Sequence, residues 1–134
     1  MHTVKEFFAA EIHQIDRSIQ QMQEAIDGSL PENKQCAYQR ALLDNKHRQR
    51  HLIETLAAQA HDFRSALVAC RLRLIEAEET HMKAASRQDA RALLHADDWW
   101  ETLNDIEFLA HLSSQLQEAI DEQTPRQNFH NGKR

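Results

Sequence analysis

Glycine and proline are nearly missing from this chain of 134 residues, which contains only two of each. Neither occurs from residue 32 to residue 124, so little in that stretch can interrupt regular structure. Aromatic residues make up only 6% of the chain, and valine and threonine are rare, which leaves little material for a β-sheet. Alanine, leucine, glutamine, glutamate and arginine are abundant instead, and these are strong helix formers. The composition therefore predicts an all-α protein.

Long apolar segments and a cysteine framework are missing as well. No run approaches the roughly 18 apolar residues of a membrane span, and the first residues lack the apolar core of a signal peptide. The chain has two cysteines, Cys36 and Cys70. On one continuous helix they would lie about 50 Å apart, too far to form a disulfide. We therefore expect a cytoplasmic protein, without membrane contact, whose cysteines are reduced.

Apolar residues recur at alternating intervals of three and four along most of the chain. This spacing places them on one face of a helix, in a line that we call a seam, and it is typical of coiled coils. The seams span residues 8–26, 53–84 and 99–120. They predict three antiparallel helices, over about residues 3–27, 30–86 and 88–123, in one domain from 1 to 123.

The helix ends carry further signals. Thr3 and Glu6 form a capping box, and Gly28 is expected to end the first helix in the left-handed conformation. The long central helix is either continuous or bent within residues 44–51, which gives an extended double hairpin or a compact helical bundle. When the first and third helices fold back along the central helix as two hairpins, the start of the first and the end of the third converge near residues 52–56. Residues 124–134 are predicted to be a mobile tail.

The segment 44–51, DNKHRQRH, has no apolar residue although it lies in the predicted central helix. Its cations Lys46, Arg48 and Arg50 suit phosphate groups, so nucleic-acid binding is one hypothesis. Alternate residues on a helix point in nearly opposite directions, however, so these cations surround the helix rather than forming one stripe. The chain has a net charge of −5, and acidic arms flank its basic middle. This distribution favours pairing between the arms and the middle.

Histidines supply the candidates for a metal site. His47 and His51 share a helical stripe with Asp44 and Glu54, a donor set that suits zinc. The neighbouring lysine and arginines oppose a bound cation. One Glu-x-x-His, ending at His81, has the spacing used in di-iron bundles, but those proteins need two such motifs. We therefore name His47 and His51 as the metal candidates and expect neither a metal nor another cofactor.

Sequence signals of catalysis are missing from the chain. It has no glycine-rich phosphate-binding loop, no nucleophile elbow, and no sign that either cysteine is activated. We therefore expect a protein that is not an enzyme.

The seams present more apolar surface than three such helices cover, and surplus surface of this kind usually binds a partner. Phe8 and Ile12 are expected to face the polar segment rather than an apolar partner. Trp99 and Trp100 diverge by about 100° on a helix, so both cannot fill the seam. The candidate partner-binding residues are Phe8, Ile12, Arg48, Arg50, Trp99 and Trp100.

In size and composition alone the chain resembles small helical chaperones and adaptors of bacterial secretion and flagellar export. It also resembles small acidic inhibitor proteins encoded by phages and plasmids. The sequence predicts a non-enzymatic interaction protein of the adaptor, chaperone or inhibitor type, which forms a homodimer or packs against a helix of another protein. Nucleic-acid binding through the basic central helix and metal binding in a helical bundle are the alternatives.

Overall fold

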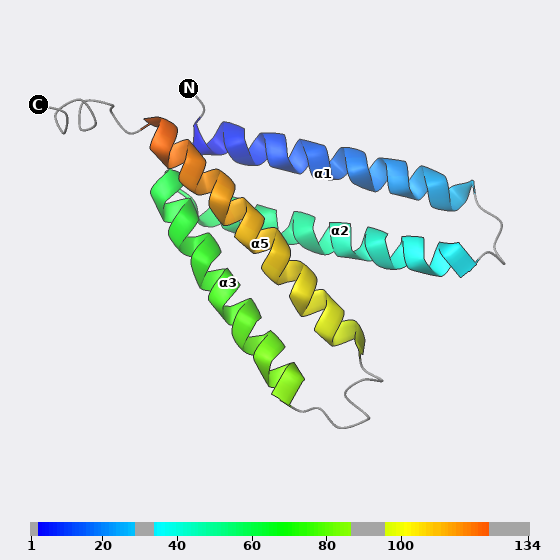
Figure 1. Ribbon diagram of the computed structural model, residues 1–134. Helices are drawn as coiled ribbons and strands as arrows, with labels where there is room; N and C mark the ends of the chain where they lie inside the picture. The colour runs from blue at the N-terminus through cyan, green and yellow to red at the C-terminus, as the bar shows by residue number, and fades with distance from the viewer. Residues whose placement is uncertain (1–2, 29–33, 87–95, 124–134) are drawn as a thin grey trace, which may run out of the picture.

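The computed structural model describes residues 3–28, 34–86 and 96–123. These ranges contain four helices and no strand (Figure 1). The helices are α1 (Val4–Asp27), α2 (Lys34–Gln59), α3 (Phe63–Ser86) and α5 (Ala96–Gln123). The all-α class is confirmed, but the prediction of three helices is wrong because the central helix is divided. The expected tail, 124–134, lies outside the described residues.

The break in the central helix lies at residues 60–62 and not within 44–51, where α2 is continuous. The Asp62 carboxylate accepts a hydrogen bond of 2.8 Å from the backbone N–H of Ser65. The Ser65 hydroxyl in turn accepts from the backbone N–H groups of His61 and Asp62, at 2.9 and 3.1 Å. These bonds satisfy donors that the start of α3 leaves without helical partners. The chain therefore changes direction here without glycine or proline.

α1 begins where the sequence predicts. The Thr3 hydroxyl accepts from the Glu6 N–H at 3.1 Å, and the Glu6 carboxylate accepts from the Thr3 N–H at 3.5 Å, which completes the capping box. Gly28 follows the last residue with a φ of −83°, in the right-handed region. Its N–H donates to the Glu24 carbonyl oxygen at 3.0 Å, so it continues the helical bonding. The predicted left-handed conformation of Gly28 is wrong.

The four helices form two antiparallel hairpins (Figure 1). α1 packs along α2, and α3 packs along α5. The hairpins meet where the start of α1, the α2–α3 break and the end of α5 come together, and they diverge away from that point. The convergence predicted near residues 52–56 is therefore found, although the break that produces it was not predicted.

The core is concentrated where the hairpins meet. Its largest fully buried side chains are aliphatic and come from α2 and α5, with Cys70 of α3 beside them. The buried cluster consists of Phe8, Ile15, Ile53, Leu56, Phe63, Ala66, Leu67, Cys70, Leu109, Leu112 and Leu116. One face of every helix thus contributes to a shared core. Among the described helices, none has the length and apolar character needed to cross a bilayer.

Candidate interaction surface

Arg48, in the polar segment of α2, forms a forked ion pair with Asp105 of α5. Its Nε lies 2.9 and 3.0 Å from the two carboxylate oxygens, and its Nη2 lies 2.7 Å from Oδ2. Asp105 is buried, and Glu101 adds a second carboxylate at 3.8 Å. The hydrogen bonds to Asp105 raise the pKa of Arg48 above its ordinary value. This contact ties the two hairpins together.

Arg50, two residues further along and on nearly the opposite face of α2, pairs with α1. Its Nε lies 2.5 Å from Oδ1 of Asp16, and it also pairs with Glu54 in its own helix. The hydrogen bond from Arg50 lowers the pKa of Asp16. Both candidate arginines therefore bind acidic residues within the chain. At Arg48 and Arg50 the basic middle of the chain therefore pairs with its acidic arms. Both guanidinium groups already have carboxylate partners, so neither is an unpaired cation for a phosphate group.

The histidines of the polar segment, His47 and His51, are exposed on α2. Across residues 3–28, 34–86 and 96–123, no three His, Cys, Asp or Glu side chains gather in a way that could hold a metal ion. His81, in the predicted second seam, lies between α3 and α5, with its Nδ1 2.8 Å from the Thr102 hydroxyl. It is a half-buried histidine at a helix–helix contact.

Phe8 and Ile12 pack at the apolar core, whereas the sequence predicted that they face the polar segment rather than an apolar partner. Phe8 is only 2% exposed, and Ile12 packs on the same cluster. The Phe7 ring meets the rings of Phe8 and Phe63 edge-on, with centroid distances of 5.4 and 5.8 Å. The physical reason is the break at 60–62, which brings α3 and α5 over the start of α1.

The tryptophan pair lies in the first turns of α5. Trp100 is 55% exposed and remains a candidate contact residue. The side chain of Trp99 is outside the described part of the structure.

Cys70 lies in the contact between α3 and α5. Its Sγ accepts a hydrogen bond from the Ser113 hydroxyl at 3.2 Å and donates to the Leu109 carbonyl oxygen at 3.4 Å. Burial raises the pKa of this thiol. A buried, protonated thiol is a poor nucleophile, so Cys70 acts in packing.

Large apolar side chains lie exposed along α3, on the face that does not pack against α5. We call them the α3 stripe: Val68, Leu72, Ile75 and Met82. They are 59, 56, 51 and 70% exposed, in that order. Their spacing of four, three and seven places them on one helical face, roughly opposite Cys70 and Ala77. Sequence analysis missed this stripe because the inner seam of the same helix accounted for the heptad pattern. The intervals of four, three and seven that link Val68, Leu72, Ile75 and Met82 were nevertheless visible in the sequence.

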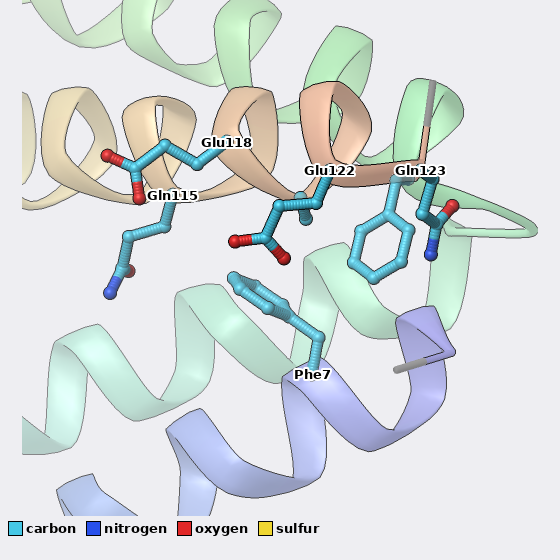
Figure 2. Close-up of a pocket in the computed structure, with 7 residues that line it drawn as sticks. Phe7, Gln115, Glu118, Glu122 and Gln123 are labelled. Carbon is cyan, nitrogen blue, oxygen red and sulfur yellow. The ribbon is translucent and has the colours of Figure 1, made fainter. Parts of the chain in front are cut away.

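A cleft of about 510 Å³ opens where the hairpins converge. Figure 2 shows Phe7 of α1 facing Gln115, Glu118 and Glu122 of α5 across it. Phe63, Ala119 and Gln123 complete the described lining. These lining residues provide phenyl rings, amides and carboxylates but no nucleophile and no imidazole.

Comparison with protein-family models, with curated proteins and with solved structures finds no match for this chain.

Proposed function

We propose that this chain is a non-enzymatic helical interaction protein, of the adaptor, chaperone or inhibitor type, which binds another protein chain through the α3 stripe. The observation that carries the proposal is the exposure of four large apolar side chains in line on one helix, each more than half exposed. Exposed apolar residues that are scattered singly need no explanation, whereas several of them aligned on one helical face are typical of a docking surface.

The energetics favour a partner on this face. Full burial of a side chain of this size contributes about 1.5–3 kcal/mol relative to full exposure. About half of that contribution is still available at each position, since the side chains are 51–70% exposed. The inner face of α3 already supplies Phe63, Leu67 and Cys70 to the core. Folding of the chain therefore does not require the stripe.

The geometry of the stripe suits a helical partner. Ridges at intervals of three and four residues pack into the corresponding grooves of another helix. Recognition of this kind uses anchors at positions i, i+4 and i+7, and Val68, Leu72 and Ile75 have this spacing.

Site-specific photocrosslinking in the cells that produce the chain tests the proposal. A photoreactive amino acid replaces Leu72 in one variant and Gln21, an exposed residue of α1, in the matched control. We expect the variant at 72 to form covalent adducts with a protein chain, either this chain or a different one, and the control to form few. Equal adduct yields at both positions, or none at 72, would contradict the proposal.

A further inference from the structure

The exposed face of α3 carries charges in a defined order as well as apolar side chains. At about 100° per residue, one sector of about 80° contains a cation, three apolar residues, an anion and a fourth apolar residue in sequence. They are Arg64, Val68, Leu72, Ile75, Glu79 and Met82. Glu78 lies about 40° outside this sector, on the same side as Arg64, and all three charged residues are exposed. The part of the pattern from Arg64 to Glu79 is nearly symmetric about Leu72, with opposite charges at its two ends.

We infer that the partner of the α3 stripe is a second copy of this chain, with the two α3 helices packed antiparallel about a two-fold axis at Leu72. The inference rests on the proposed function, and it specifies both the partner and the register. A two-fold contact uses the same patch on both copies and closes at the dimer, so the patch must be complementary to itself.

The antiparallel register meets that requirement. Val68 of one copy faces Ile75 of the other, and the two Leu72 side chains meet at the axis. Arg64 of each copy then lies beside Glu78 and Glu79 of the other, which forms two symmetric groups of opposite charges. A parallel pair in register would instead place Arg64 beside Arg64 and glutamate beside glutamate. Charge complementarity therefore selects the antiparallel orientation.

Arg71 is the cation nearest to the proposed axis. Its Nη2 donates to the Gln117 side-chain oxygen of α5 at 3.3 Å. That hydrogen bond draws the guanidinium toward α5, away from the exposed side of α3. The two copies of Arg71 are thus held apart when the stripes meet.

α3 lies at an outer edge of the molecule in Figure 1, and the stripe side chains are exposed, so a second copy can approach them. The segment from Arg64 to Glu79 is about 22 Å long at 1.5 Å per residue. A contact between single helices of this length is at the small end of stable interfaces, which bury about 1,200–2,000 Å². We therefore expect a dimer in reversible equilibrium with the monomer rather than a permanent one.

Sedimentation equilibrium of the purified full chain over a range of concentrations tests the inference. We expect Arg64→Glu to raise the dimer dissociation constant at least tenfold, and Glu78→Arg with Glu79→Arg to do the same. All three substitutions together exchange the charges and should return the constant to within about threefold of the original value. Arg17→Glu, on exposed α1, is the matched control and should leave the constant unchanged.

Disulfide trapping in a Cys36→Ser background tests the orientation. Chains carrying Val68→Cys mixed with chains carrying Ile75→Cys should form mixed disulfides, because the antiparallel register places these positions opposite each other. Chains with Val68→Cys alone should form far fewer. The reverse result would indicate a parallel pair and overturn the inference.

Two further results would also overturn the inference. One is a purified chain that stays monomeric at hundreds of micromolar. The other is a dimer that neither the charge reversals nor Leu72→Lys weakens, with folding of that variant verified by circular dichroism. If the chain is monomeric but position 72 still crosslinks to a different protein in cells, the proposed function stands and only the self-association fails. If position 72 also gives no adduct, both fail.

Discussion

Arg48 and Asp105 join the two hairpins through a forked ion pair in which the carboxylate is buried and the guanidinium is half exposed. Their residues are 57 positions apart in the chain, so this bond exists only when α2 and α5 are docked. Because the Asp105 side chain is only 8% exposed, its charge depends largely on the guanidinium for compensation.

Arg48→Ala should therefore destabilise the protein by about 1–3 kcal/mol, the cost of leaving a buried charge with a lost hydrogen-bond partner. Urea denaturation measures the free energy of unfolding. Arg50→Ala is the control, because its pair with Asp16 is exposed, and should cost less. The double variant Arg48→Met with Asp105→Leu should recover most of the loss, since it removes both charges. Equal losses for Arg48→Ala and Arg50→Ala would contradict the role of burial.

The sequence predicted the helical class because that class depends on local properties. Composition and the spacing of three and four residues are visible without any tertiary contact. The inner faces were also predicted: Ile53, Leu56 and Leu67 of the second seam are buried. The pairing of basic and acidic segments was favoured over external binding, and Arg48 and Arg50 pair internally.

The break between α2 and α3 was missed because the seam keeps its spacing across it. Leu56, Ala60 and Phe63 continue the intervals of four and three, although the helix ends at Gln59. No glycine or proline marks the position. The signal that could have located it is Asp62 followed by Ser65 three residues later, a polar pair suited to a helix start. The wrong placement of Phe8 and Ile12 followed from this omission.

The hydrogen bonds at the α3 cap lead to a second prediction. Ser65→Ala removes the hydroxyl that accepts from His61 and Asp62 and should cost about 0.5–2 kcal/mol, the usual range for a helix cap. A comparable substitution away from a cap, Ser114→Ala on exposed α5, should have little effect. Urea denaturation measures the unfolding free energy of both variants. Equal values for Ser65→Ala and Ser114→Ala would show that the cap does not stabilise the turn between α2 and α3.

The same cap predicts a dependence on pH. The hydrogen bond from the Ser65 backbone lowers the pKa of Asp62. The folded value is then below the unfolded value of about 3.9. The stabilisation is present above the unfolded pKa and is lost as pH falls through the folded pKa. The stability difference between the original chain and Asp62→Asn should therefore shrink from pH 5 to pH 2. Asp44→Asn, at an exposed site on α2, is the control, and a difference that grows on acidification would contradict the assignment.

The convergence of the hairpins predicts where the fold is most sensitive. Leu56 has no exposed surface, whereas Leu72 is 56% exposed. Leu56→Ala should cost about 2–5 kcal/mol, because it leaves a cavity in the core. Leu72→Ala is the same chemical change and should cost less than about 1 kcal/mol in the monomer. Denaturation at submicromolar concentration separates this effect from self-association. Similar losses of unfolding free energy in the two variants would contradict the assignment of Leu56 to the core.

The buried thiol of Cys70 makes the contact between α3 and α5 accessible to a chemical probe. In a Cys36→Ser chain, the folded protein should react with a thiol reagent at least a thousandfold more slowly than the unfolded protein, because attack requires local opening. Gln21→Cys in a chain lacking both natural cysteines supplies the exposed control and should react at once. Rapid labelling of Cys70 at neutral pH would show that α3 and α5 separate readily around Ser113.

Since burial raises the pKa of Cys70, the folded state keeps the thiol protonated after the unfolded thiol has ionised. The stabilisation is complete below the unfolded pKa of about 8.5 and is lost as pH rises through the folded value. Cys70→Ala should therefore lose less stability between pH 8 and pH 10 than the original thiol.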